Sequence, residues 1–463
     1  VMVQVRWQAS LQSQRYWYPA RSGPRSIRTE RVAFDTERPM RVQCRFCDIA
    51  MAGFAFSDTG AACDGVALSS LVATEGSPLY VYSAAVIEER YRAFDTALGS
   101  YPHRVHYALK ANSTLGLVRL IGGIGSAVDA NSGGEIAVAI RAGIEPNDIV
   151  FTGAGKTGVE LEQAVSLGVH VINAESAGEL ARIDEIATAI GKRARVALRV
   201  NPDIDAKSHP AISTGGRVHK FGVPLEEAGA VYRDATSRNG LNLVGVHAHI
   251  GSQIMTLDPL RRMAVAVTTF AQTLVADGIP LKHLDLGGGL GISYDGRPSL
   301  SVDQYARTLV DAVTPTGLTL LLEPGRWIVA PSGALLATVV DVKRQLSGRY
   351  FVVLDAGMTE LMRPALYNAI HRVEQVIRRH GADVTCDIVG PICETTDVIR
   401  LGHAMPLPDV GDVLIVRDTG AYGSAMASNY NRHPLPAEVL IESGQSRLIR
   451  RRQSIADLLA CEE

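Results

Sequence analysis

Cysteine is scarce in this chain, which has only six among its 463 residues. That number excludes a small fold held together by disulfides and predicts a protein of the reducing cytoplasm. Neither sign of charge dominates, because 46 Lys and Arg face 48 Asp and Glu, so neither a nucleic acid nor an anionic membrane is expected as a partner. No apolar run reaches the roughly 18–20 residues that a membrane-spanning helix needs. The hydrophobic content of 46% is nevertheless ample for a packed core and excludes a wholly disordered chain.

The first 50 residues differ in composition from the remainder of the chain. They contain nine arginines, four acidic residues and no lysine, and they show no sustained hydrophobic period. An Arg-rich, acid-poor start is typical of an organelle transit peptide. Alternatively, Cys44 and Cys47 could form half of a zinc site, although no second pair of ligands lies nearby. We favour a third interpretation, a disordered extension that precedes a natural start at Met51.

From about residue 104 the sequence alternates short apolar runs with longer stretches of helical periodicity. One such stretch is Ser176–Gly191, where Leu180 and Ile183 recur at helical spacing. Strands that alternate with helices predict parallel pairing, and eight repeats predict an α/β fold with a (β/α)8 barrel, which we place at residues 86–330. We expect the long fifth gap, with His209–Gly216, to form a loop that covers a site. The predicted strands are Arg104–Leu109, Ala127–Ser132, Ile149–Gly153, Val169–Ala174, Arg195–Asn201, Leu243–Ile250, His283–Gly287 and Leu318–Glu323.

The pattern changes after residue 331, where strand-like runs follow one another without regular helices. This arrangement predicts a second, mostly antiparallel β domain at residues 331–463. Residues 64–83, which include the apolar run Leu79–Tyr82, also predict strand. We therefore expect residues 51–85 to supply N-terminal strands that join the same β domain. The predicted strands of the C-terminal part are Leu335–Val342, Tyr350–Leu354, Cys386–Val389, Val413–Val416, Pro436–Ile441 and Ser446–Arg450.

Residues with useful chemistry follow several of the predicted strands, and a barrel carries its reacting groups at the C-terminal ends of its strands. Lys110 ends the first strand and is a candidate Schiff-base amine, although a surface lysine is the commoner explanation. Gly287–Gly289 follow the seventh strand and could admit a phosphate to the backbone amides, although most glycine runs are only turns. Glu323 and Arg326 follow the eighth strand, either as an acid and an anion-binding cation or as a salt-bridged turn.

Two histidines, His247 and His249, end the sixth strand. Because alternate residues of a strand face the same side, they could bind a metal together, but no matching set of ligands ends the other strands. The alternative is an imidazole that lies against a flat cofactor ring. Asp129–Glu135, after the second strand, also has the pattern of a helix-capping box. A lysine, a stacking imidazole, a glycine turn and an acid are together what pyridoxal phosphate requires.

Five ordered motifs between Met51 and the end of the chain resemble those of the fold-type III pyridoxal-phosphate-dependent decarboxylases. They are YALKAN (107–112), HIGSQ (249–253), GGG (287–289), EPGR (323–326) and GPICE (390–394). Within that group the chain is most similar to the diaminopimelate decarboxylases. The segments that carry this closer similarity are ISTG (212–215) with KFG (220–222), and RPALY (363–367).

The resemblance implies how these residues serve the cofactor and the reaction. Lys110 would form the Schiff base, His249 would stack on the pyridine ring, and Glu323 would keep the ring nitrogen protonated. After the loss of CO2, Cys393 or Lys110 would return a proton to the substrate carbon. The phosphate would be held by Ser252, Gly288 and Gly289, and the other cofactor-binding residues would be Gly325, Arg326 and Tyr422, of which Tyr422 would also contact the substrate.

The same resemblance implies meso-2,6-diaminopimelate as the substrate and L-lysine and CO2 as the products, in the last step of lysine biosynthesis. Arg326 and Arg363 suit the distal carboxylate, because a guanidinium can bind a carboxylate through two hydrogen bonds. Tyr367 would donate its hydroxyl, and Glu394 would pair with the distal ammonium. In this family Cys393 and Glu394 reach the site of the neighbouring subunit, which implies a homodimer with shared active sites.

Three other functions stay open on the sequence alone. A related decarboxylase would act on D-ornithine, D-lysine or carboxynorspermidine, and Thr395 and Thr396, where many relatives have Ser followed by a small residue, bear on that choice. A catalytically inactive homologue that regulates a partner would tend to lose Lys110 or Cys393, and both are present. A zinc hydrolase built on His247 and His249 would need a metal for its activity.

Overall fold

The computed structural model describes residues 53–57, 59–206, 209, 212–216 and 219–462. The extension expected at residues 1–50, with Cys44 and Cys47, lies outside this part of the chain, as does Met51. Among the described residues, no helix is both long enough and apolar enough to cross a lipid bilayer.

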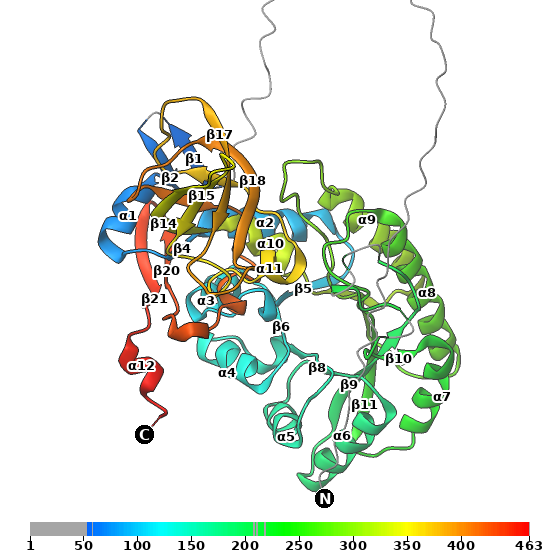
Figure 1. Cartoon of the computed structure of the whole chain (residues 1–463). Coiled ribbons are helices and arrows are strands. Elements are labelled where there is room, and N and C mark those ends of the chain that lie inside the picture. The colour runs from blue at the N-terminus through cyan, green and yellow to red at the C-terminus, as the bar shows by residue number, and fades with distance from the viewer. Residues whose placement is uncertain (1–52, 58, 207–208, 210–211, 217–218, 463) are drawn as a thin grey trace, which may run out of the picture. The chain divides into compact units, whose positions relative to one another are not determined.

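Eight parallel strands close on themselves into a barrel (Figure 1). The barrel is complete because β8 pairs with β9 and β13 pairs with β5, and the short strand β10 (Val223–Pro224) adds to β9. All eight predicted strands are present, with small shifts at their ends, so the predicted fold class is confirmed. The barrel strands are β5 (His103–Ala108), β6 (Ala127–Ala130), β7 (Ile149–Phe151), β8 (Val171–Ala174), β9 (Ala194–Asn201), β11 (Leu241–His247), β12 (His283–Asp285) and β13 (Thr319–Leu322).

Helices cover the outside of the barrel (Figure 1), and side-chain caps fix where several of them begin. Thr157 and Glu160 form a complete capping box at the start of α5. Ser132 caps α4, but Glu135 accepts from the amide of Asn131 instead of completing the predicted box. The helices are α2 (Ala84–Ala97), α3 (Leu115–Gly123), α4 (Gly133–Ala142), α5 (Gly158–Leu167), α6 (Ala177–Ala189), α7 (Leu225–Ala235), α8 (Leu257–Ala276), α9 (Val302–Val313) and α10 (Arg326–Val329).

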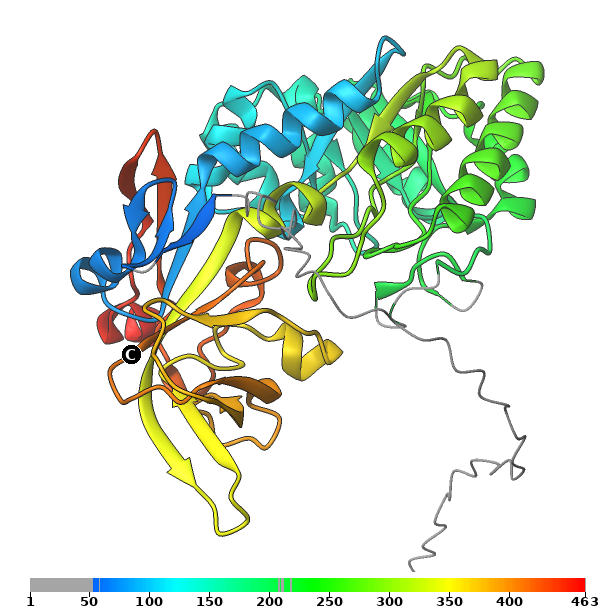
Figure 2. The ribbon, with the colours of Figure 1, turned by 90° about the horizontal axis from the view of Figure 1, so that it is seen from above.

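A second, mostly antiparallel sheet follows the barrel in sequence. Its strand β4 (Leu79–Ser83) precedes the barrel and lies between β14 and β20, antiparallel to β14 and parallel to β20. β14 and β15 form a long hairpin, drawn in yellow in Figure 2. The other elements are β14 (Gly333–Arg344), β15 (Tyr350–Leu354), α11 (Arg363–Tyr367), β16 (Val373–Gln375), β17 (Asp383–Val389), β18 (Val398–Pro406), β19 (Val413–Val416), β20 (Ala437–Glu442), β21 (Gln445–Arg450) and α12 (Ile455–Leu459).

The segment before β4 differs from the expectation that it consists of strands that join this sheet. Residues 68–75 form helix α1 (Leu68–Glu75) instead of strand, because Leu68 and Leu71, one helical turn apart, are both buried. Phe54 and Leu68 belong to one apolar cluster with Leu336 of β14, which packs this segment against the second sheet without adding strands to it. The remaining strands form a separate small sheet of β1 (Phe54–Ser57), β2 (Gly60–Cys63) and β3 (Val66–Ala67).

The loop after β19 contacts the C-terminal end of the first barrel strand. The amide of Tyr422 donates to the carbonyl oxygen of Ala111 over 2.8 Å. The side-chain amide of Asn112 donates to the carbonyl oxygen of Gly420 over 3.2 Å. These bonds bring a residue of the second domain, Tyr422, to the mouth of the barrel beside Lys110.

Candidate active site

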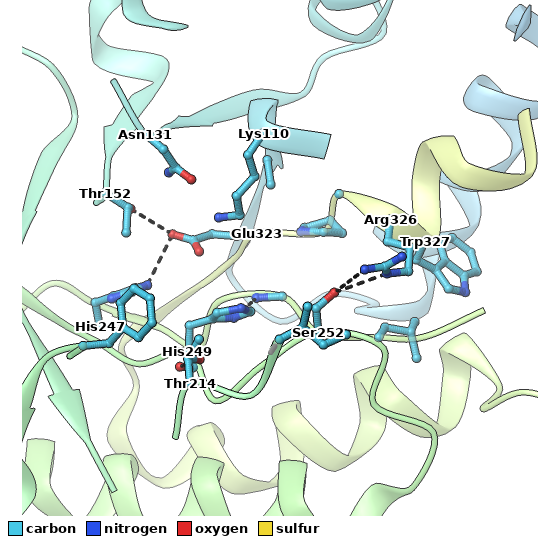
Figure 3. A pocket seen from close by; sticks show the side chains of 18 of the residues that line it. Lys110, Asn131, Thr152, Thr214, His247, His249, Ser252, Glu323, Arg326 and Trp327 are labelled. Atoms are coloured by element: carbon cyan, nitrogen blue, oxygen red, sulfur yellow. Dashed lines mark hydrogen bonds and ion pairs between the residues drawn. The ribbon is translucent and has the colours of Figure 1, made fainter. Parts of the chain in front are cut away.

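A cavity of about 310 Å³ opens at the C-terminal ends of the barrel strands (Figure 3). Its lining combines residues that follow seven of the eight barrel strands with one tyrosine of the second domain. All the residues expected to bind the cofactor are among them, namely Lys110, His249, Ser252, Gly288, Gly289, Glu323, Gly325, Arg326 and Tyr422.

Lys110 lies just after β5, and its amine meets a buried carboxylate of the neighbouring strand. Its Nζ is 3.0 Å from Oδ2 of Asp129 on β6, whose side chain is fully buried, while about a third of the Lys110 side chain is exposed. Burial works to lower the pKa of Lys110, but the negative charges of Asp129 and Glu323 outweigh it and raise that pKa. Asp129 therefore holds the amine at the cavity wall and keeps it protonated when nothing else is bound there.

Glu323 follows β13 and is the buried acid of the cavity. Burial alone would raise its pKa, but His247 and Lys110 reverse the effect and hold the pKa of this carboxyl below its usual range. The hydroxyl of Thr152 donates to its Oε1 over 3.4 Å (Figure 3). The cavity thus contains an ionised carboxylate that can accept a proton or a hydrogen bond from a bound group.

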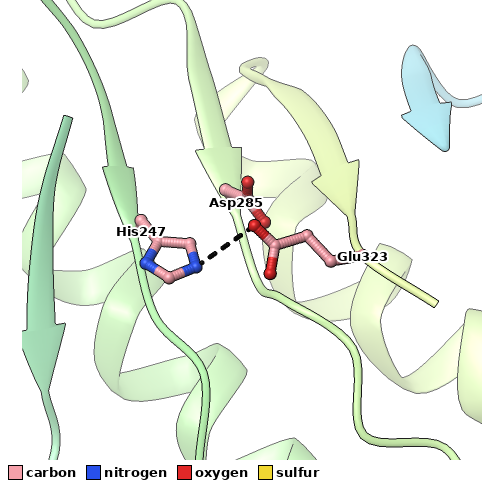
Figure 4. A group of neighbouring side chains, drawn as sticks. All are labelled: His247, Asp285 and Glu323. Carbon is pink, nitrogen blue, oxygen red and sulfur yellow. Dashed lines mark ion pairs between the residues drawn. The ribbon is translucent and has the colours of Figure 1, made fainter. Parts of the chain in front are cut away.

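His247, Asp285 and Glu323 form a buried cluster in which one ligand atom from each lies within 4.8 Å of the others (Figure 4). His247 Nε2 is 3.4 Å from Glu323 Oε1. Burial and the adjacent Glu323 carboxylate raise the pKa of Asp285 well above its usual range. Two buried carboxyls this close do not both ionise, so Asp285 keeps its proton and Glu323 carries the charge.

His249 does not share its partner with His247, which argues against the paired metal ligands considered from the sequence. Its Nδ1 accepts from the amide of Gly288 over 3.2 Å, so the ring proton sits on Nε2. Burial and the positive charges of Lys110 and Arg199 lower the pKa of His249 well below its usual range. A neutral, flat ring therefore forms one wall of the cavity.

The glycine turn after β12 requires residues without side chains. Gly287 and Gly289 adopt φ values of +64° and +111°, which other residues rarely adopt. A Cβ on Gly288 would lie 2.3 Å from the carbonyl oxygen of Glu323. Beside this turn, Arg326 donates to the hydroxyl of Ser252 over 3.0 Å. The turns after the seventh and eighth barrel strands thus form a cradle with a cation and a hydroxyl, where barrels commonly bind phosphate.

These groups fit pyridoxal phosphate. The cradle of Gly288, Gly289, Ser252 and Arg326 suits its phosphate, and the ionised carboxylate of Glu323 suits a protonated ring nitrogen. Lys110 supplies the amine that such a cofactor needs.

The residues expected to bind the substrate lie partly beyond this cavity. Arg326 lines it, whereas Arg363, at the start of α11, does not. Both guanidiniums contact Tyr294. Arg326 donates to the Tyr294 hydroxyl over 2.8 Å, and the Arg363 guanidinium lies 4.4 Å above the Tyr294 ring. Tyr367 is half-buried, and its ring lies 5.7 Å from that of His209.

Cys393 and Glu394 follow β17 and do not line the cavity of their own chain. Both are exposed. Glu394 accepts a hydrogen bond from the hydroxyl of Tyr430 over 2.8 Å. The structure therefore brings together the cofactor set but not these two residues.

Several residues that line the cavity or lie beside it had no role in the sequence-based prediction. Asp129 and Arg199 end the second and fifth barrel strands, so their position at the barrel mouth was a usable signal. Thr152 ends the third strand in the same way. Thr214 lies in the loop expected to cover a site, and its hydroxyl donates to the carbonyl oxygen of His249 over 2.7 Å. This loop forms a wall of the cavity in its described residues.

Comparison with known proteins agrees with this geometry. Residues 84–330 match the pyridoxal-binding domain of the pyridoxal-dependent decarboxylases. The chain is 43% identical to the diaminopimelate decarboxylase of Pseudomonas aeruginosa, over 88% of this chain and 98% of that protein. It is also 43% identical to the diaminopimelate decarboxylase of Aquifex aeolicus, over 84% of this chain and 93% of the relative.

Solved structures give the same result. Diaminopimelate decarboxylase from Helicobacter pylori complexed with L-lysine superposes with a TM-score of 0.83 at 39% identity, over 85% of this chain and 98% of that one. A lysine/ornithine decarboxylase from Vibrio vulnificus, at 24% identity and a TM-score of 0.72 over 81% of this chain and 97% of that one, shares the fold. The chain belongs to the diaminopimelate decarboxylase family of pyridoxal-phosphate-dependent enzymes.

Proposed function

We propose that this enzyme converts meso-2,6-diaminopimelate to L-lysine and CO2. The observation that carries the proposal is a pair of buried arginines, Arg326 and Arg363, at the edge of the cofactor cavity. Their hydrogen-bond partners in the described part of the chain are a serine, a tyrosine and a histidine, none of which is a carboxylate. Buried charges normally require a counter-charge, and a second carboxylate on the substrate supplies one.

At the reacting end of the substrate, each residue of the cavity has a separate role. When bound, pyridoxal phosphate withdraws electrons from the carbon that loses CO2. Lys110 holds the cofactor through its Nζ, and Glu323 holds a proton on the ring nitrogen with its ionised carboxylate. His249 would support the ring from one face, and its lowered pKa makes it too weak a base to take that proton.

The distal end of the substrate determines which amino acid is accepted. Arg363 and Arg326 bind the distal carboxylate, with Tyr367 as a further donor, and Tyr422 contacts both substrate and cofactor. Ornithine or lysine would leave the Arg363 guanidinium without a counter-charge, which is costly at a buried position. D-ornithine, D-lysine and carboxynorspermidine are therefore less suitable substrates for this site.

We also propose that the enzyme is a homodimer in which each subunit completes the site of the other. Cys393 returns a proton to the substrate carbon from its Sγ, or Lys110 does so from Nζ, and Glu394 pairs with the distal ammonium. The position of Cys393 and Glu394 outside the cavity of their own chain, and their exposure, support this arrangement. We place the enzyme in the cytoplasm, in keeping with the four cysteines of the described residues, all of which are free.

The direct test is release of CO2 by the purified enzyme with pyridoxal phosphate. meso-Diaminopimelate is compared with D-lysine, D-ornithine and carboxynorspermidine at equal concentrations. We expect meso-diaminopimelate to give the highest kcat/KM and L-lysine to appear in equal amount with CO2. A higher kcat/KM for D-lysine would contradict the proposed substrate.

A further inference from the structure

We propose that His371 and Tyr294 are positioning residues that hold Arg363 ready for the distal carboxylate of the substrate without neutralising it. This inference rests on the proposed function and adds two residues to it. Neither residue lines the cavity, and no sequence motif pointed to either one.

His371 makes a direct contact with Arg363. Nη1 of Arg363 lies 2.7 Å from Nε2 of His371, and both side chains are buried. The other ring nitrogen, Nδ1, lies 2.8 Å from the carbonyl oxygen of Arg417. Because a carbonyl oxygen can only accept, Nδ1 carries the ring proton and Nε2 accepts from the guanidinium. The backbone at Arg417 thus fixes the tautomer of His371, and His371 fixes the orientation of Arg363.

Tyr294 holds the second side of the same guanidinium. Arg363 lies 4.4 Å above the Tyr294 ring, and the rings of His371 and Tyr294 make a T-shaped contact with their centroids 5.1 Å apart. The Tyr294 hydroxyl accepts from Nη1 of Arg326 over 2.8 Å. One tyrosine therefore sets the position of both arginines, through its face and through its hydroxyl.

The neutrality of these partners matters for binding. An aspartate or glutamate would orient Arg363 equally well, but it would also neutralise the charge that attracts a substrate carboxylate. His371 is neutral because burial and the charge of Arg363 lower its pKa to about 3. In the described part of the chain, the buried Nε of Arg363 has no hydrogen-bond partner. His371 thus orients Arg363 through Nη1, while the Nε donor and the positive charge remain available for the substrate carboxylate.

The test compares three variants of the holoenzyme at position 371 and position 294. His371→Gln keeps a neutral acceptor, whereas His371→Glu adds a counter-charge of similar length. We expect His371→Glu to raise KM for meso-diaminopimelate roughly 10–100-fold above that of His371→Gln, which corresponds to the loss of one charge-assisted hydrogen bond. Tyr294→Leu removes the supporting ring and should raise KM about 10-fold. The effects should fall on KM more than on kcat.

Inhibition by cadaverine, a diamine without a carboxylate, is the matched control. Its inhibition constant should change less than about threefold in every variant, because a purely structural defect would affect both ligands alike. Equal KM values for His371→Gln and His371→Glu would overturn the inference, and so would a parallel rise in the inhibition constant of cadaverine. If His371→Glu does not fold, an unchanged KM in Tyr294→Leu overturns it independently.

A binding experiment separates this inference from the proposed reaction. Titration calorimetry of the wild-type holoenzyme with pimelate and with heptanoate compares a dicarboxylate with a monocarboxylate of the same chain length. We expect tighter binding of pimelate and loss of that preference in His371→Glu. No preference in the wild type would overturn the inference. Pimelate preference without release of CO2 from meso-diaminopimelate would contradict only the proposed reaction.

Discussion

Acidification should destabilise the barrel through two histidines inside it. His106 on β5 is fully buried, and both of its ring nitrogens are without hydrogen-bond partners among the described residues. The same holds for Nε2 of His283 on β12, and the ring of His170 lies 5.8 Å and 5.6 Å from these two rings. Burial, together with the neighbouring His170, lowers the pKa of His106 and of His283 from 6.5 to about 3.

The direction and size of the effect follow from these shifts. Between pH 6.5 and about 3 the unfolded chain takes up protons on His106 and His283, whereas the folded chain leaves both neutral. The free energy of unfolding therefore falls as the pH falls through this range. A pH of 5 lies about 1.5 units below the pKa of an unfolded imidazole. The free energy of unfolding therefore falls by about 2 kcal/mol per histidine, or about 4 kcal/mol for the pair.

Urea unfolding at pH 7.5 and pH 5.0, followed by circular dichroism, measures this loss. The variant His106→Leu removes one of the two groups and should reduce the difference between the two pH values by about 2 kcal/mol. His380, which is exposed, provides the matched control, because His380→Leu should leave the difference unchanged. An equal pH dependence in wild type and His106→Leu would refute the argument that buried neutral histidines cause the acid sensitivity.

Three further predictions concern the active site. Lys110→Ala should abolish CO2 release and leave the circular dichroism spectrum unchanged, because the side chain lies at the cavity wall and not in the packed core; a folded variant with full turnover would contradict its role. Glu323→Gln should lower kcat at least about 10-fold, since a neutral amide replaces a charge-assisted bond to the ring nitrogen, and steady-state kinetics that match the wild type would rule this role out. Lys110→Ala and Cys393→Ala, each inactive alone, should regain about 25% of wild-type activity when mixed subunits pair at random, because half of the dimers then have one complete site; no recovery after verified subunit exchange would count against shared sites.

Much of the barrel could be predicted because its information is local. The run Arg195–Asn201 is apolar, β-branched and bounded by helical periodicity, and it became β9 (Ala194–Asn201) with almost no change. Lys110 and Glu323 could be assigned to one site because the C-terminal ends of parallel barrel strands meet at the same rim. The same rule would have found Asp129, which ends the strand next to that of Lys110.

Other parts depend on contacts that no local pattern contains. Tyr294 lies in the barrel domain, in the loop between β12 and α9, so packing of the two domains brings it to Arg363. His371 lies in the same domain as Arg363, between α11 and β16, and the path of the loop brings it there. Helix α1 was mistaken for strand because its apolar residues lie close to the strongly strand-like run Leu79–Tyr82. The site role of Cys393 depends on a second subunit and stays a prediction.

The central claim is that Lys110 carries pyridoxal phosphate at the mouth of the barrel. Borohydride reduction of the purified holoenzyme, followed by proteolysis and mass spectrometry of the peptides, tests it most directly. The account predicts a stable phosphopyridoxyl adduct on Lys110 and the loss of the visible absorbance of the bound cofactor. An adduct on another lysine, such as the buried Lys156, with Lys110 unmodified, would contradict it.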